Sequence, residues 1–134
     1  MTEELNQASR RPVKVFISYA HKDAEIASAL EKHLSVLSRM GEVQSWYDRH
    51  IEPGMPWKDA VDEHLNSSDI ILLLVSADFL ASDYCYSIEM HRALERHDAG
   101  EAVVVPIIVR PVDWSAAPFS MLQVLPRDGK PITT

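Results

Sequence analysis

Cysteine, glycine and basic residues are all scarce in this chain of 134 residues. Cys85 stands alone, which excludes an intrachain disulfide and a thiolate metal cluster and favours a reducing, cytoplasmic location. The chain carries 13 basic and 20 acidic side chains, and this negative balance argues against direct binding of nucleic acid. The longest apolar run, residues 70–75, is far shorter than the roughly 20 residues that a membrane-spanning helix needs. We therefore expect neither nucleic acid nor a membrane among the partners.

The length and composition are those of a single globular domain. Hydrophobic residues make up 46% of the chain and charged residues 25%, which is ordinary for a protein with one packed core. Residues 1–12 have no hydrophobic periodicity and predict a flexible N-terminal leader. Residues 13–134 form the predicted domain.

Short apolar runs alternate with segments of helical periodicity. The runs that predict strands cover residues 13–17, 43–47, 70–75 and 103–109. The segments that predict helices run from Asp23, as a cap, to Gly41, from Pro56 to Leu65, and from Ser82 or Asp83 to His97, before Gly100. The expected buried face of the first helix consists of Ile26, Leu30, His33, Leu34 and Leu37. This alternation predicts an α/β fold with a central parallel sheet and helices on both faces.

The C-terminal part of the sequence has a different character. Pro106 is unfavourable inside the fourth predicted strand. Beyond Arg110, spaced prolines predict loops and short extended pieces rather than a long helix. A fold of this kind usually closes with another helix, and none is predicted before Thr134. Either the chain is a piece of a larger protein or its last helix is missing.

In an open parallel sheet, ligands bind beyond the carboxyl ends of the strands. The loops expected there are residues 18–21, 48–55, 76–84 and 110–114. They contain no glycine-rich phosphate loop, which disfavours conventional dinucleotide or kinase chemistry. The second loop is longer than the usual connection between a strand and a helix, and such loops are often functional.

Three other kinds of site are considered and set aside. His21, Asp48, His50 and Asp83 show no recognisable metal-ligand spacing, so we expect no metal. Asp48 directly follows a strand, as a phosphoacceptor would, but the first loop lacks the acidic pair that such a receiver domain requires. Cys85 has only Glu89, four residues on, as a nearby base, and a buried cysteine that packs is the commoner outcome.

Four blocks of sequence, in order, resemble a TIR (Toll/interleukin-1 receptor) domain. They are residues 15–20 (VFISYA), 48–57 with Glu52-Pro53-Gly54, 69–76, and 79–85 (FLASDYC) followed by Glu89. The likeness extends over residues 12–132 and includes the late stretch Gly129-Lys130-Pro131-Ile132. The resemblance implies a flavodoxin-like three-layer fold, with a final helix after this last stretch.

The resemblance also implies a chemistry. Many TIR domains cleave NAD+ as a substrate, without any other cofactor, using one glutamate on the third helix, and Glu89 occupies that position. A carboxylate can stabilise the oxocarbenium-like ribose that forms as nicotinamide leaves. The residues expected around the substrate are Ser18, Tyr19, His21, Asp48, Glu52, Trp57, Tyr84 and Cys85. Tyr84 stands where the family often has tryptophan, and core packing is the expected role of Trp46.

Residues 48–56 correspond to the BB loop of the family, which mediates contacts between TIR domains. The expected partners are therefore NAD+, other TIR domains in a homo-oligomer or filament, and a sensor outside this chain. The first interpretation is an NAD+-cleaving effector of bacterial defence that self-association activates. The alternatives are a non-enzymatic TIR–TIR interaction adaptor and a virulence factor that mimics host adaptors.

Overall fold

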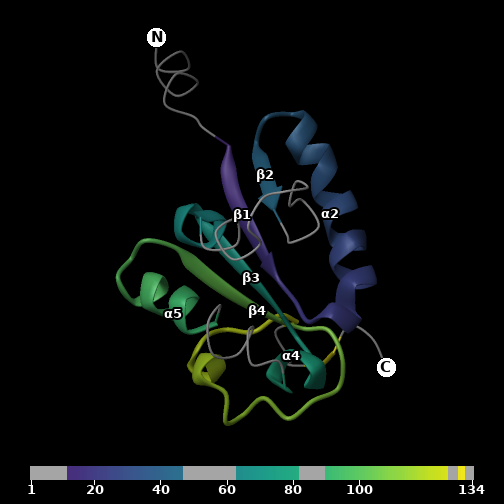
Figure 1. The fold of residues 1–134 in the computed structure, drawn as a ribbon, viewed down its shortest axis with the longest axis vertical. Helices are drawn as coiled ribbons and strands as arrows, with labels where there is room; N and C mark the ends of the chain where they lie inside the picture. The colour runs from purple at the N-terminus through teal and green to yellow at the C-terminus, as the bar shows by residue number, and fades with distance from the viewer. Residues whose placement is uncertain (1–11, 47–62, 82–89, 127–129, 132–134) are drawn as a thin grey trace.

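The computed structural model describes residues 12–46, 63–81, 90–126 and 130–131. The strands are β1 (Val13–Ser18), β2 (Val43–Trp46), β3 (Ile70–Val75) and β4 (Val103–Ile108). The helices are η1 (His21–Asp23), α2 (Ala24–Arg39), α4 (Ala77–Ala81), α5 (Met90–Asp98) and η4 (Pro118–Met121), and residues 63–67 are also helical. Figure 1 shows α2 and α5 on opposite sides of the sheet, with α4 beyond the carboxyl ends of the strands.

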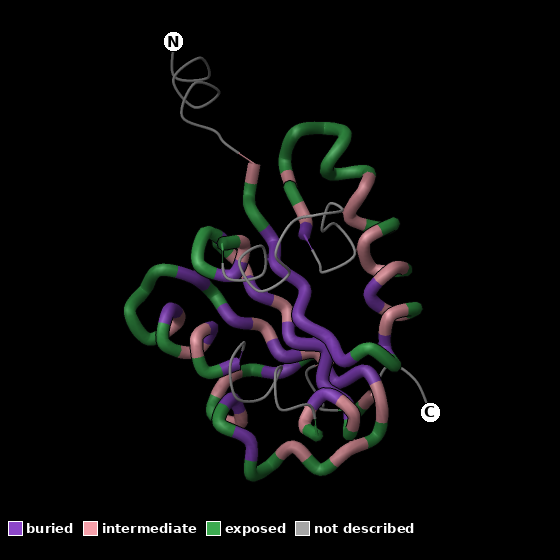
Figure 2. The backbone as a smooth tube through the Cα atoms, viewed as in Figure 1, coloured by how far each residue is buried: buried purple, intermediate pink, exposed green. Residues whose placement is uncertain are grey.

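All four strands are parallel and lie in the order β2-β1-β3-β4. The order reverses between β1 and β3, because the chain first adds β2 on one side of β1 and then crosses to the other side. β3 is covered on both faces, as its continuous apolar run predicts: Leu73 belongs to one hydrophobic cluster and Leu74 to the other. The predicted α/β architecture is confirmed, and Figure 2 shows the buried residues running along the strands.

The two hydrophobic clusters make a three-layer structure. The larger cluster packs Phe16, Trp46 and Phe79 with residues of α5 and of the C-terminal segment. The smaller cluster lies against α2 and includes Ile17, Tyr19 and Ala27. The sheet therefore separates two cores.

The first helix confirms its predicted position but not all of its predicted face. Ile26, Leu30 and Leu34 pack against the smaller cluster, whereas His33 is exposed and Leu37 is 37% exposed. The prediction was wrong for these two residues, because the packed side of α2 consists of the fully buried Ala27 together with Ile26, Leu30 and Leu34. The left-handed backbone of Gly41 ends this helix region, and that of Gly100 follows α5 in the same way.

The sequence-based boundaries differ from the structure in three places. The first strand ends at Ser18, one residue later than predicted, and the fourth ends at Ile108, one residue earlier; Tyr47, the predicted last residue of the second strand, lies outside the described residues. The loop predicted over residues 76–84 contains the helix α4. Ser76 caps that helix, because its Oγ accepts the Phe79 N–H at 3.1 Å.

Pro106 fits within β4 because of the direction in which its backbone points. Its carbonyl accepts the Leu125 N–H at 2.8 Å, on the side of β4 away from β3. An N–H at this position would point to the same side, so its absence removes no hydrogen bond to β3. The segment after Arg110 is otherwise irregular, as predicted, and η4 is its helical turn.

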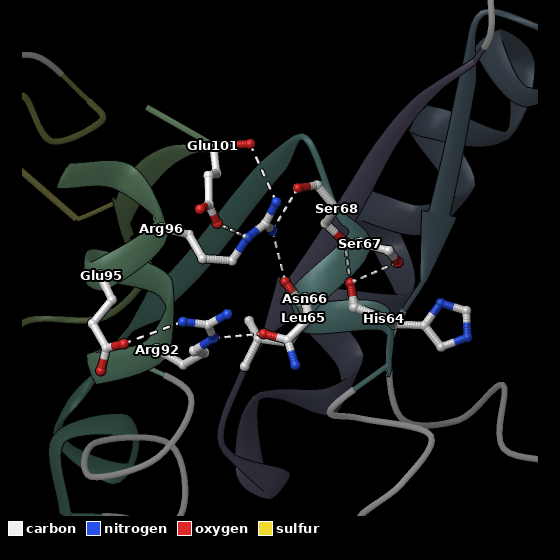
Figure 3. Close-up of polar contacts among 9 residues, drawn as sticks. All are labelled: His64, Leu65, Asn66, Ser67, Ser68, Arg92, Glu95, Arg96 and Glu101. Atoms are coloured by element: carbon white, nitrogen blue, oxygen red, sulfur yellow. Dashed lines mark hydrogen bonds and ion pairs between the residues drawn. The ribbon is translucent and has the colours of Figure 1, made fainter. Parts of the chain in front are cut away.

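Arg96 is a buried cation that joins three elements (Figure 3). One terminal nitrogen, Nη1, donates to the carbonyl oxygens of Leu65 at 2.8 Å and Ser68 at 2.6 Å. The other, Nη2, donates to the Glu101 carbonyl at 3.2 Å, and Nε lies 3.5 Å from the Glu101 carboxylate. The side chain thus links the end of helix 63–67, the start of β3 and the turn after α5.

Candidate functional site

The carboxyl ends of β1, β3 and β4 meet at one edge of the sheet, beside the start of α2 (Figure 1). This edge lies next to the reversal of strand order, where open α/β sheets bind ligands. It contains the loops that sequence analysis selected after these three strands. The second loop, residues 48–55, lies outside the described residues.

Ser18, Tyr19 and His21 follow one another along β1 and into η1 at this edge. Ser18 is 1% exposed and Tyr19 8%, and Tyr19 packs within the smaller hydrophobic cluster. His21 is exposed. Of the three, His21 alone presents its side chain to solvent in this structure, while contact of any of them with a substrate stays a prediction.

The other predicted site residues lie outside the described residues. They are Asp48, Glu52, Trp57, Tyr84, Cys85 and the predicted catalytic Glu89. Met90, which directly follows Glu89, is fully buried at the start of α5. Their roles therefore stay predictions from the sequence.

Asp23 forms a buried polar network that sequence analysis missed. Its side chain was predicted to cap α2, but no capping hydrogen bond forms. One carboxylate oxygen, Oδ2, accepts the Ser76 hydroxyl at 2.5 Å, and the other, Oδ1, accepts Arg110 Nε at 2.6 Å. Asp23 is completely buried. The network ties together the segments that follow β1, β3 and β4.

The carboxylate of Asp23 further favours the charged form of Arg110, a side chain that is protonated in any case. Its hydrogen bond, followed by its charge, raises the pKa of the Arg110 guanidinium above the ordinary value. The Arg110 side chain is 42% exposed although its partner is fully buried. Arg110 is therefore a permanent cation at the edge of the sheet.

A cavity among the described residues lies elsewhere. It has a volume of about 320 Å³ and is lined by Lys14 and Val15 of β1, by residues 44–46 of β2, and by side chains of helix 63–67 and Ser68. Trp46 forms part of its wall and stacks on His64 with ring centroids 4.2 Å apart. Trp46 is 8% exposed, so its predicted role in core packing is confirmed. Its lining includes none of the residues that follow β1, β3 and β4.

The described residues contain neither a metal-binding cluster nor a membrane-spanning helix. These residues contain no group of three or more His, Cys, Asp or Glu that could hold a metal ion. None of the helices in the described part of the chain combines the length and the apolar character needed to cross a membrane.

Asp113, in the loop after β4, forms a local turn with Ser115. Its Oδ1 accepts the Ser115 hydroxyl at 2.7 Å and the Ser115 N–H at 3.1 Å, and these bonds lower the pKa of Asp113 below 3.8. Because the folded-state pKa is lowered, the stabilisation is complete above the ordinary pKa and is lost as pH falls through the lowered value.

The Ser115→Ala variant is expected to raise the pKa of Asp113 toward 3.8, since the hydroxyl makes the larger contribution. An NMR titration of the Asp113 carboxyl carbon measures this change. An unchanged titration curve in the variant would show that the hydroxyl bond is not formed in solution.

Comparison with known proteins identifies the family. The chain is 59% identical over 119 residues to the uncharacterized protein y4lF of Sinorhizobium fredii (strain NBRC 101917 / NGR234), an alignment that covers 89% of this chain. The chain spans 37% of the length of that relative.

Two solved structures share the fold. The TIR domain of the Toll-related receptor TRR-2 from Hydra magnipapillata aligns with a TM-score of 0.60 at 21% identity, over 74% of this chain and 72% of that one. The TIR domains of the activated Roq1 resistosome, which directly recognises the pathogen effector XopQ, align with a TM-score of 0.61 at 19% identity, over 77% and 61%. The family model described as TIR domain matches residues 15–128, and the chain therefore belongs to the TIR domain family.

Proposed function

We propose that this domain cleaves NAD+ to nicotinamide and ADP-ribose, or to a cyclic isomer of ADP-ribose, with Glu89 as the catalytic carboxylate. The observation that supports this most is the convergence of three strand ends at one edge in a member of the TIR family. The sequence places Glu89 directly before Met90, the first described residue of α5. The glutamate position of the NAD+-cleaving members is thus retained.

The reaction requires few protein groups. Nicotinamide in NAD+ is a cationic leaving group, and the bond between its nitrogen and the ribose carbon breaks with both electrons moving to nicotinamide. A carboxylate close to the ribose stabilises the positive charge that develops on the sugar. Water then adds to the ribose carbon and releases a proton, which gives ADP-ribose; attack by an adenine nitrogen instead gives a cyclic product. No cofactor is needed.

Assembly is part of the proposal. The Roq1 resistosome is an assembled state in which TIR domains have this fold, and the BB-loop segment, residues 48–56, is the expected contact between copies. We infer that a cytoplasmic sensor, on the same or another chain, brings copies together and that assembly activates cleavage. A role in bacterial defence is consistent with this arrangement.

The test measures release of nicotinamide from NAD+ by the purified chain. The reaction is run at high protein concentration and with a crowding agent, and the products are quantified by chromatography. The proposal expects release that rises more steeply than protein concentration, with ADP-ribose or its cyclic isomer in equal amount. Full turnover at high dilution would contradict activation by assembly. If light scattering shows that the chain has self-associated and no nicotinamide is released, the enzymatic function is contradicted.

A non-enzymatic TIR–TIR interaction module is the second candidate. The observation that favours it is the burial of Ser18 and Tyr19, which leaves His21 as the exposed member of the first predicted loop. In that case the domain would self-associate without consuming NAD+. The same assay separates the two functions.

A further inference from the structure

Arg110 has an arrangement that a purely structural ion pair does not require. Its Nε donates to the fully buried carboxylate of Asp23, and the second oxygen of that carboxylate is held by Ser76. Among the described residues, neither terminal guanidinium nitrogen of Arg110 has a hydrogen-bond partner. Two parallel donors of a fixed cation therefore remain available at the carboxyl edge of the sheet.

From this geometry we propose that Arg110, oriented by Asp23, binds the pyrophosphate of a dinucleotide at the carboxyl edge of the sheet. The paired terminal nitrogens of a guanidinium match two oxygens of a phosphate group, and such bidentate bonds are among the strongest that a side chain makes. Fixing the guanidinium through Nε reduces the conformational entropy lost on binding. This inference rests on the proposed function, because it assigns a residue to the phosphates of the same substrate.

The charges around Arg110 set limits on this site. Asp23, Asp78 and Glu25 all raise the pKa of Arg110 by their negative charge, and Lys22 lies 3.9 Å from Asp78. These carboxylates oppose the approach of an anion. Affinity for the phosphates must therefore come from direct hydrogen bonds to the guanidinium rather than from the electrostatic potential of the surrounding charges. Binding should then depend on the geometry of the guanidinium.

Lys22 provides a matched control. It is a cation at the same edge of the sheet. It lies within η1, next to Asp23, and its side chain is 79% exposed. Removing Lys22 changes the local charge by the same amount as removing Arg110, but it removes no oriented pair of donors. A site that depends on geometry distinguishes the two residues, and one that depends on charge alone does not.

The experiment is calorimetric titration of the purified chain with ADP-ribose, which keeps the pyrophosphate, and with adenosine, which lacks it. Arg110→Met is expected to weaken ADP-ribose binding about tenfold or more, and Arg110→Lys to weaken it similarly because the paired donors are lost. Lys22→Met should change it less than about threefold. Asp23→Asn should weaken binding because the guanidinium loses its orienting charge, and adenosine binding should be unchanged in all four variants.

The inference would be overturned by no detectable binding of ADP-ribose to the wild type, by equal losses in Arg110→Met and Lys22→Met, or by an equal loss of adenosine binding. Circular dichroism checks the fold of each variant, and Arg110→Lys decides the question if Arg110→Met does not fold. Binding of ADP-ribose that depends on Arg110, in a chain that releases no nicotinamide, would refute the enzymatic function alone. Nicotinamide release with unchanged binding by Arg110→Met would refute this inference alone.

Discussion

Replacing Glu89 by Gln is expected to lower the rate of nicotinamide release on the order of 10³-fold, because the amide cannot stabilise positive charge on the ribose. The substitution conserves shape, so the thermal unfolding midpoint should change little. Release is measured over a range of NAD+ concentrations up to saturation, with the wild type and the variant at one protein concentration at which both are assembled. The loss should appear in kcat rather than in KM, since the carboxylate acts on charge that develops only in the transition state.

Glu95 offers a matched control. It is exposed on α5, and its carboxylate accepts a hydrogen bond from Arg92 at 3.1 Å. Glu95→Gln removes the same charge six positions later and should leave nicotinamide release within about twofold of the wild type. A Glu89→Gln variant that retains full activity would remove Glu89 from the mechanism, whatever the wild type does.

The largest expected loss of stability comes from Arg96→Ala. The substitution removes a buried guanidinium from three carbonyl oxygens, those of Leu65, Ser68 and Glu101. These acceptors then lose their partner at the junction of three elements, and a cavity replaces the side chain. We expect the free energy of unfolding to fall by about 3–5 kcal/mol, as for other broken buried charge networks. Urea unfolding followed by circular dichroism measures the change.

Arg92→Ala is the matched control, one helical turn earlier on α5 (Figure 3). Arg92 also makes hydrogen bonds, to Asn66 at 2.5 Å and Glu95 at 3.1 Å, but its side chain is 43% exposed. Exposed pairs contribute little, so this variant should lose less than about 1 kcal/mol. Similar losses in the two variants would mean that burial does not determine the effect of Arg96.

The strands and the long helix α2 were the parts of this fold that sequence could predict. The runs at residues 70–75 and 103–109 are apolar and β-branched, and a parallel sheet with two covered faces requires such runs. The helix α4 was missed because its five residues are too few for a periodic pattern to appear. Local composition thus fixes the sheet and leaves short helices undetermined.

The polar networks could not be predicted, because their members are far apart in the chain. Asp23 is separated by 53 residues from Ser76 and by 87 from Arg110. Asp23, two residues after the first predicted loop, fitted the cap of the following helix, and that local role is the one that sequence favours. The available signal was positional: polar residues follow three strands whose ends meet at one edge.

The proline within β4 also bears on how copies of this domain can meet. An exposed strand edge with a full row of donors and acceptors is a template for pairing with another molecule. On the outer side of β4, Pro106 supplies no donor, while Ile108 donates to the Leu125 carbonyl and Leu125 donates to the Pro106 carbonyl. The backbone donors and acceptors that an added strand would pair with are therefore already hydrogen-bonded or, at Pro106, absent. Growth of a continuous intermolecular sheet past β4 is thereby disfavoured, and ordered assembly would use side-chain surfaces instead of aggregation-prone strand addition.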